Sequence, residues 1–206
     1  MRRGATLWAA ALRLKPRRVR GAAWPRLWVV GDARRLPDAR KAVPGLAAGR
    51  RRGVGGVLAR DQAAAVLPAL ARDCRQIGVA LLIAGDGRAA LRLRAGLHVP
   101  DRRVTAGLLP FLAARRAGAP WARLTVAVHG RAGVARLHHL GADAGIVSPA
   151  FPTASHPGAP ALGPYRWAKL AARVPRALAL GGIEPATAGR LPRHCAGLMA
   201  IGAFIA

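Results

Sequence analysis

Short runs of mostly apolar residues alternate with longer amphipathic stretches along most of the chain. The runs do not show the alternation of apolar and polar residues that a half-exposed strand has, and many end at glycine or at a charged residue. Runs of this kind are typical of β-strands that are buried on both faces. The pattern predicts eight strands, over residues 27–30, 53–60, 79–84, 96–99, 124–129, 144–147, 177–180 and 197–201.

The stretches between these runs carry apolar residues at helical spacing. Residues 62–77 form one apolar face from Val66, Leu67, Leu70, Cys74 and Ile77, and residues 131–140 form another from Val134, Leu137 and Leu140. Buried strands separated by helices are parallel, and eight such units in about 180 residues predict an α/β fold, a compact (β/α)8 TIM barrel. An open doubly wound sheet is the alternative, because periodicity does not show whether a sheet closes.

Both ends of the chain depart from this repeat. Residues 1–24 are rich in arginine and place Leu7, Ala11 and Leu14 on one helical face, so we expect a basic N-terminal arm or helix before a barrel of residues 25–206. Few residues follow residue 201, and we expect the last helix of the barrel to be short or missing. One hypothesis is that the basic N-terminal helix covers the gap.

Charge is the most unusual property of the composition. The 206 residues include 34 lysines and arginines against 8 acidic residues, which gives a formal net charge of +26. This balance favours phosphorylated or other anionic partners, although a generally arginine-rich composition would produce the same charge. Nucleic acid is not expected as a partner, because the sequence lacks clustered aromatic residues and a recognition helix.

Cysteine usage and hydropathy bear on the compartment. Cys74 and Cys195 are far apart and match no zinc-binding spacing, which favours a reducing environment. No run of 18 or more apolar residues occurs, so we expect no transmembrane segment and a cytoplasmic location. The sequence leaves the oligomeric state open.

Candidate phosphate-binding residues lie at the carboxyl ends of the last two predicted strands. Gly181 and Gly182 follow the seventh strand, and Gly202 follows the eighth. In (β/α)8 barrels the active site lies at this end, and the loops after strands seven and eight commonly bind phosphate. Glycine also simply terminates strands, so the pattern is compatible with a purely structural role.

Titratable residues lie at other strand ends. His129 ends the fifth strand, where it can act as an acid or base near neutral pH or serve as a packing residue. Asp86 stands in Gly85-Asp86-Gly87, where it is either a turn residue or one of the few carboxylates available to hold Mg²⁺.

The stretch GIVSPAFPTASHPGAPALG, residues 145–163, joins a strand to a loop rich in proline and hydroxyl groups. This stretch and several strand ends resemble the thiamine phosphate synthase and TenI family over residues 27–206. The residues that carry the resemblance are Gly141-Ala-Asp143, Phe151-Pro-Thr153-x-Ser155, Ala161-Leu-Gly163, Leu180-Gly-Gly-Ile183, Val126-x-Val-His129 and Gly96-Leu-His98. The resemblance implies a TIM barrel that acts in thiamine biosynthesis.

In the synthases of this family, an aminopyrimidine diphosphate loses pyrophosphate, and a thiazole phosphate nitrogen captures the resulting cation. The resemblance therefore implies phosphorylated small-molecule substrates, with Arg60 contacting pyrophosphate and Thr153 and Gly182 close to the thiazole phosphate. Asp86 lies within one residue of the position of the first magnesium aspartate. The remaining candidates for phosphate binding are Ser155, His156, Gly181 and Gly202.

Three departures from the family pattern affect the charge of the site. Gln62 and His156 stand where the family has lysines, and Arg103 stands where a second magnesium carboxylate is expected, with Asp101 offset from that position. The resemblance implies Mg²⁺ as a cofactor, and the loss of the second carboxylate weakens that implication.

Three functions stay open on this basis. A divergent synthase would use Arg60 in the release of pyrophosphate. A TenI-like thiazole tautomerase would use His129 to move a proton, without diphosphate or metal. A catalytically silent barrel would only bind a phosphorylated ligand.

Overall fold

A computed structural model of the chain describes residues 2–47, 55–153, 158 and 160–201. Eight parallel strands form a closed barrel in chain order, because the last strand pairs with the first, with Leu198 opposite Leu27. The barrel confirms the predicted TIM-barrel class, and the alternative of an open sheet is wrong. The strands are β3 (Leu27–Val30), β4 (Gly55–Ala59), β5 (Ala80–Ala84), β6 (Gly96–Val99), β7 (Leu124–Val128), β8 (Ala144–Val147), β9 (Ala177–Leu180) and β10 (Gly197–Ala200).

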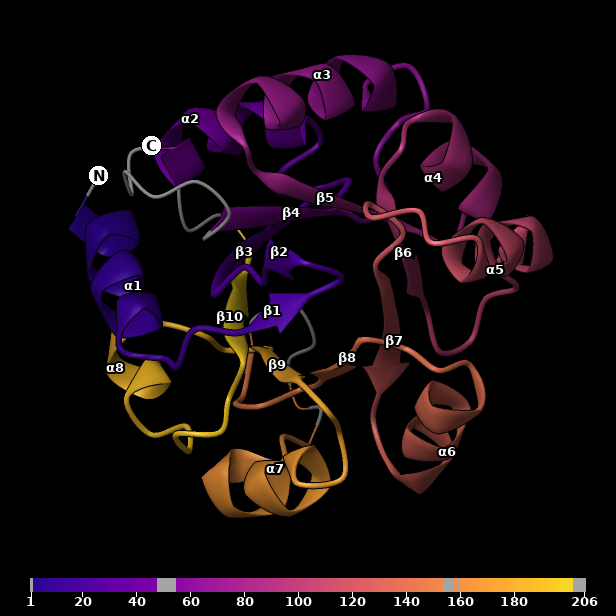
Figure 1. Cartoon of the computed structure of the whole chain (residues 1–206). Coiled ribbons are helices and arrows are strands. Elements are labelled where there is room, and N and C mark those ends of the chain that lie inside the picture. Colours follow the sequence, from indigo (N-terminus) through magenta and orange to yellow (C-terminus); the bar gives the residue numbers. More distant parts are fainter. Residues whose placement is uncertain (1, 48–54, 154–157, 159, 202–206) are drawn as a thin grey trace.

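Helices form a ring around the barrel (Figure 1). Those that follow a strand are η1 (Ala39–Ala42) with α2 (Val43–Ala47), α3 (Leu67–Ile77), α4 (Gly87–Arg92), α5 (Leu108–Arg116), α6 (Arg131–His139), α7 (Gly163–Ala171) and α8 (Pro185–Ala188). The helix predicted over residues 62–77 begins only at Leu67. Its expected first residue, Gln62, instead uses its side chain to hold the segment after β3. No helix among the described residues is both long and apolar enough to cross a membrane.

Buried side chains form two layers that follow the alternation of each strand. In β3, Leu27 and Val29 pack outward toward the helices, whereas Trp28 and Val30 belong to the cluster inside the barrel. The indole of Trp28 is fully buried there, and a Cβ atom on Gly56 would lie only 2.4 Å from its ring. Glycine at position 56 therefore provides the space that Trp28 occupies.

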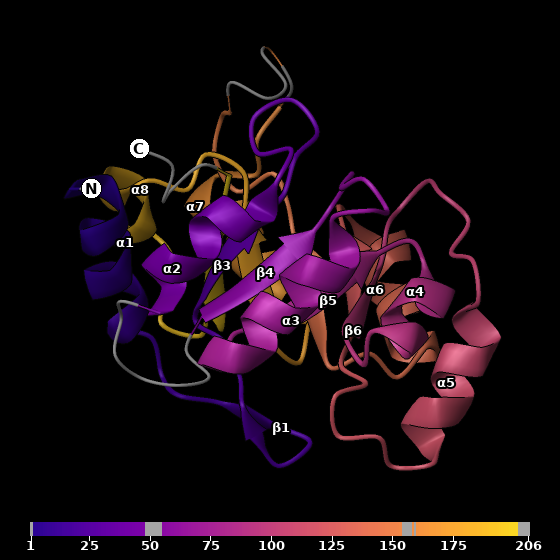
Figure 2. The same ribbon diagram turned by 90° about the horizontal axis from the view of Figure 1, so that it is seen from above.

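The amino-terminal end of the barrel is covered by a small hairpin, β1 (Arg18–Val19) and β2 (Ala22–Ala23), which the sequence did not predict. Figure 2 shows β1 at the end of the molecule opposite the segment that joins β3 to α2. Val19 and Trp24 bury their side chains in the interior cluster, and the Trp24 and Trp28 rings lie 5.7 Å apart. Because this end is filled, ligand access is restricted to the carboxyl ends of the strands.

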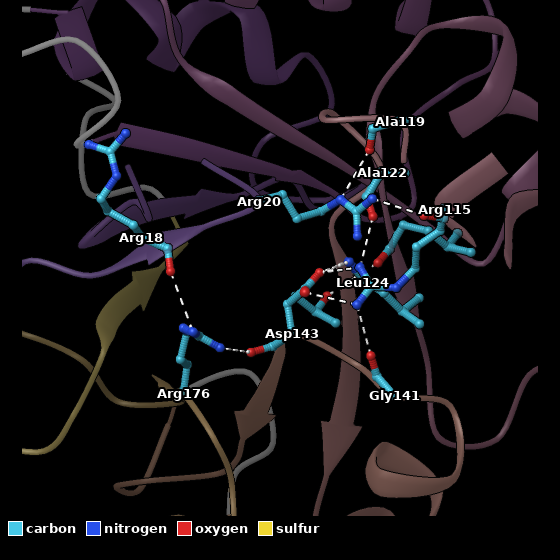
Figure 3. Close-up of polar contacts among 11 residues, drawn as sticks. Arg18, Arg20, Arg115, Ala119, Ala122, Leu124, Gly141, Asp143 and Arg176 are labelled. Atoms are coloured by element: carbon cyan, nitrogen blue, oxygen red, sulfur yellow. Dashed lines mark hydrogen bonds and ion pairs between the residues drawn. The ribbon is translucent and has the colours of Figure 1, made fainter. Parts of the chain in front are cut away.

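Asp143 organises the polar contacts at the covered end (Figure 3). Its carboxylate accepts two hydrogen bonds from the guanidinium of Arg115 and one from the backbone N–H of Leu124. Arg20, from the hairpin turn, donates to the backbone oxygens of Ala119 and Arg115. The Asp143 of the Gly-Ala-Asp motif therefore fastens β7, α5 and the loop before β8 to one another, at the end of the barrel opposite the cavities.

Helix α1 (Arg2–Leu12) packs on the barrel wall between α8 and α2, beside β3 (Figure 1). Leu7 and Ala11 are fully buried in the outer layer of the core, as the helical pattern predicted, and the Trp8 indole donates to the backbone oxygen of Gly45 in α2. Arg26 donates to the carbonyls of Leu12, the last residue of the helix, and of Leu14. This packing supports the hypothesis that the basic helix covers the gap that a reduced last barrel helix would leave. The expectation that this last helix is short or missing concerns residues outside the described ranges. The boundary at residue 24 stays a proposal, since residues on both sides of it share one core.

If α1 is part of the barrel wall, a charge on its buried face will destabilise the whole protein. We expect Leu7→Asp to lower the free energy of unfolding by about 3 kcal/mol or more, because it removes a buried side chain and buries a carboxylate. The exposed Ala9 provides the matched control, and Ala9→Asp should change stability by less than about 1 kcal/mol. Urea unfolding of both variants measures the difference, and equal stabilities would show that α1 is only loosely attached.

Candidate functional site

Two adjoining cavities lie at the carboxyl ends of the strands. The larger, of about 740 Å³, is called the glycine cavity, and the smaller, of about 420 Å³, is called the arginine cavity. The glycine cavity is lined by Arg35, Arg60, His129, Ser148, Pro149, Pro152, Thr153, Pro160, Leu180, Gly181, Gly182, Ile183, Glu184, Met199, Ala200 and Ile201. The arginine cavity is lined by Asp32, Arg34, Arg35, Arg60, Asp61, Ala84, Gly85, His98, Pro100 and Arg103. Arg35 and Arg60 line both cavities.

Gly181 and Gly182, at the end of β9, form one wall of the glycine cavity. The segment after β8 packs directly on them, with the N–H of Phe151 donating to the Gly181 carbonyl at 3.0 Å. Gly182 has a φ of +60°, and a Cβ atom there would lie 2.3 Å from the carbonyl oxygen of Pro152. The Thr187 hydroxyl, which the sequence reasoning missed, donates to the Gly182 carbonyl at 2.7 Å and ties this turn to α8. The two glycines thus bring β9 and the loop after β8 together around the cavity.

Among the loop candidates, Thr153 lines the glycine cavity. Ser155, His156 and Gly202 lie outside the residues that the structure describes. Their proposed contacts with phosphate therefore stay predictions from the sequence.

His129 follows β7 and lines the glycine cavity. Its Nδ1 lies 2.8 Å from the backbone oxygen of Ser148, and a carbonyl oxygen can only accept a hydrogen bond. Nδ1 therefore carries the proton of the neutral ring, and Nε2 keeps its lone pair. This contact leaves Nε2 as the ring nitrogen that can accept a proton.

Arg60 follows β4 and is held by a short ion pair with Asp32, with 2.6 Å between Nη2 and Oδ2. Burial raises the pKa of Asp32, but hydrogen bonds from the Arg35 backbone, the Arg60 side chain and the Arg34 backbone outweigh it and bring the pKa below its ordinary value. Asp32 is therefore ionised at neutral pH, and its charge fixes the guanidinium of Arg60 between the two cavities.

Gln62 stands where the family pattern has a lysine, and its side chain has a structural task here. Its amide oxygen accepts from the N–H of Ala39, and its amide nitrogen donates to the carbonyl of Leu36, both at 2.8 Å. A lysine has no acceptor and could not make the first of these bonds. Gln62 therefore clamps the segment that carries Arg34 and Arg35, which sequence reasoning did not identify as cavity residues.

The carboxylates near the strand ends are committed to other partners. Asp86 caps α4 by accepting from the N–H of Ala89 at 2.9 Å, and it lines neither cavity. Asp61 pairs with Arg103 and Asp101 pairs with Arg136, each at 2.9 Å. Within the described ranges, no three His, Cys, Asp or Glu residues are grouped so that they could hold a metal ion. Because Asp86, Asp61 and Asp101 are engaged by backbone or arginine donors, this donor set does not fit a Mg²⁺ site, and the assignment of Mg²⁺ to Asp86 gains no support from the geometry.

His98, at the floor of the arginine cavity, is only 6% exposed and has its Nδ1 3.0 Å from the Thr125 hydroxyl. Burial, reinforced by the charges of Arg60 and Arg136 and by His129, lowers the pKa of His98 to about 3. His98 is therefore neutral at physiological pH and adds no charge to the cavity.

The buried His98 should make the protein less stable in mild acid. Between pH 6.5 and about 3 the unfolded chain binds a proton at this residue that the folded chain does not. The contribution to stability is complete above pH 6.5 and is lost at roughly 1 kcal/mol for each pH unit as the pH falls. Urea unfolding from pH 7 to pH 4.5 should show a shallower dependence for His98→Gln than for the native chain. Parallel curves would contradict this assignment.

The fold and the cavities define a TIM-barrel protein with a positively charged site at the strand ends. A family model described as "Thiamine monophosphate synthase" (TMP-TENI) matches residues 50–205. The chain therefore belongs to the thiamine phosphate synthase and TenI family, which confirms the resemblance seen in the sequence.

Comparison with solved structures gives the same fold at low sequence identity. The thiamine phosphate pyrophosphorylase from Pyrococcus furiosus has a TM-score of 0.65 and 19% identity, with 86% of this chain and 85% of that chain covered. A structure described as "Native KDPGal structure" has a TM-score of 0.55 and 16% identity, with coverages of 84% and 80%. A search of curated proteins gives no significant match. At these identities the structural likeness concerns the fold.

Proposed function

We propose that this chain acts in thiamine biosynthesis and joins an aminopyrimidine diphosphate to a thiazole phosphate with release of pyrophosphate. The observation that carries the proposal is the pair of adjoining cavities that share Arg35 and Arg60. A reaction between two phosphorylated substrates needs two anion-binding regions with the reacting atoms between them. Family membership and the likeness to a thiamine phosphate pyrophosphorylase support this assignment.

The glycine cavity is the proposed site of the thiazole phosphate. Its walls bring together the strand-end glycines Gly181 and Gly182 and the side chain of Thr153. Backbone N–H groups at glycines approach a phosphate oxygen closely because no side chain intervenes. The phosphate would lie against this wall, with the thiazole ring turned toward the centre of the barrel mouth.

Arg60 is the proposed group that stabilises the departing pyrophosphate. In the reaction, the bond between the aminopyrimidine carbon and the diphosphate oxygen breaks, and its electron pair leaves with pyrophosphate. A fixed guanidinium between the cavities stabilises the negative charge that develops on that oxygen. The lone pair of the thiazole nitrogen then forms the new carbon–nitrogen bond.

His129 supports a second candidate function, a TenI-like thiazole tautomerase. Its contact with Ser148 leaves Nε2 as the proton acceptor in the ring, and the side chain lines the cavity proposed for the thiazole phosphate. Moving a proton between two positions of a bound ring needs such a base and no diphosphate.

Incubation with both phosphorylated substrates separates these functions. We expect thiamine phosphate and pyrophosphate in equal amounts, and the gene should rescue a cell that requires thiamine. In the tautomerase alternative, His129→Ala should lower isomerisation by about 100-fold or more, while the exposed His139→Ala serves as the control. No thiamine phosphate at high enzyme concentration would reject the synthase. The absence of both activities would leave a barrel that only binds its ligand.

A further inference from the structure

The arginine cavity has an excess of positive charge that its own carboxylates do not balance. Four arginines and two aspartates line it, and His98 is neutral, so the lining carries a net charge of about +2 at neutral pH. Asp32 is paired with Arg60, and Asp61 is paired with Arg103. The guanidinium groups of Arg34 and Arg35 form no ion pair or hydrogen bond with any residue that the structure describes.

The segment that carries Arg34 and Arg35 is held in place by its backbone. Both of their N–H groups donate to Oδ1 of Asp32, at 3.2 and 3.1 Å. Further along the segment, the clamp from Gln62 fixes Leu36 and Ala39. The two guanidinium groups therefore extend from a fixed segment at the rim of the cavity, and an anion that binds there needs to order only their side chains.

A divalent cation would find few ligands in this cavity. Both oxygens of Asp32 already accept hydrogen bonds, and Asp61 is engaged by Arg103. The surrounding arginines would also repel a metal ion. Arginine, by contrast, presents planar pairs of N–H donors that match the oxygens of a phosphate group.

We propose that the arginine cavity binds the diphosphate group directly, without Mg²⁺, and that Arg34, Arg35 and Arg103 supply the positive charge that a metal ion would otherwise provide. Arg103 is suited to this role because its side chain is 76% exposed at the cavity rim and its partner, Asp61, also lies 3.8 Å from Arg60. The identity of the anion rests on the function proposed above. The inference that this anion binds without a metal ion is argued from the residues that line the cavity.

Calorimetric titration of the full chain with pyrophosphate tests the proposal. One pyrophosphate should bind per chain in EDTA, and excess Mg²⁺ should leave the affinity unchanged or weaken it, because Mg²⁺ competes for the same phosphate oxygens. Binding that appears only when Mg²⁺ is present would overturn the proposal.

A pair of double variants separates the cavity from the general charge of the protein. Arg34→Gln with Arg35→Gln should weaken pyrophosphate binding by about tenfold or more, because charge-assisted hydrogen bonds are lost. Arg92→Gln with Arg116→Gln removes the same charge from exposed positions in the last turns of α4 and α5, and should change the affinity by less than about twofold at 0.15 M salt. Equal losses in both double variants would mean that pyrophosphate binds through the overall positive charge, and would overturn the proposal.

Activity measurements distinguish this inference from the proposed function. Pyrophosphate binding in EDTA through Arg34 and Arg35, without any formation of thiamine phosphate, would support the metal-free anion site and reject the synthase. Formation of thiamine phosphate only in the presence of Mg²⁺ would support the synthase and reject the metal-free site.

Discussion

Replacement of Arg60 by alanine is expected to lower the rate of thiamine phosphate formation by roughly 100- to 1,000-fold, the usual effect of removing a fixed donor from a developing negative charge. Arg60 is held by an ion pair and lines both cavities. Its loss also leaves the Asp32 carboxylate without its closest cation, so the pKa of Asp32 should rise toward its ordinary value. Steady-state measurement of kcat and KM for both substrates shows whether the loss lies mainly in kcat, as a role in the departure of pyrophosphate requires.

Two further variants separate the chemical role of Arg60 from its structural role. Arg60→Lys keeps a positive charge but loses the paired N–H donors, and should recover only part of the activity. Arg60→Ala combined with Asp32→Asn removes the uncompensated charge and should restore thermal stability without restoring activity. If Arg60→Ala keeps activity within about tenfold of the native chain, Arg60 does not stabilise the leaving group.

The strands were predictable because a parallel barrel buries them on both faces. The predicted bounds of β3, β6 and β9 agree with the structure residue for residue, and each strand is followed directly by glycine or proline. Closure of the sheet was not visible in the periodicity. It depends on the pairing of β10 with β3, two segments at opposite ends of the chain.

The hairpin at the amino-terminal end had no local signal of this kind. Its two strands are only two residues long, and Arg20 and Arg123 hold this segment through contacts with residues about 100 positions away. In the sequence, nothing distinguished these arginines from the others that give the chain its net positive charge. The structure shows that several of them are hydrogen-bonding groups that fasten the hairpin and Asp143 to the barrel.

Site residues could be predicted from the sequence where they lie directly at the end of a strand, but not where they lie on a longer connecting segment. His129 was identified because the carboxyl ends of parallel strands meet at one face, and Arg60 was identified through the family resemblance. Arg35 was missed because it lies five residues beyond β3, on a segment whose path is set by Asp32 and Gln62.

Asp86 shows the opposite problem, because its sequence context allowed two different roles. Gly-Asp-Gly fits a magnesium ligand and a helix cap equally well, and only the hydrogen bond from Ala89 reveals that this carboxylate caps α4.

Gly182→Ala is expected to have the second large effect, because this position has no room for a side chain. The added Cβ would lie 2.3 Å from the Pro152 oxygen and 2.8 Å from the Phe151 Cβ, in a backbone conformation with a φ of +60°. The segment after β8 would have to move away from β9, at an expected cost of about 2–4 kcal/mol in stability. The wall proposed to hold the thiazole phosphate would move with it, so KM for that substrate should rise by about tenfold or more, with a smaller effect on KM for the aminopyrimidine diphosphate.

Gly141 is the matched control, because it has a φ of +58° and a Cβ atom added there would meet no other part of the chain within 4 Å. Gly141→Ala carries the backbone penalty alone, about 1 kcal/mol, at the end of the barrel opposite the cavities. The difference between the two variants therefore measures the close approach of β9 to the loop after β8. If Gly182→Ala behaves like Gly141→Ala in urea unfolding and in substrate kinetics, the loop adapts without loss, and Gly182 does not shape the phosphate site.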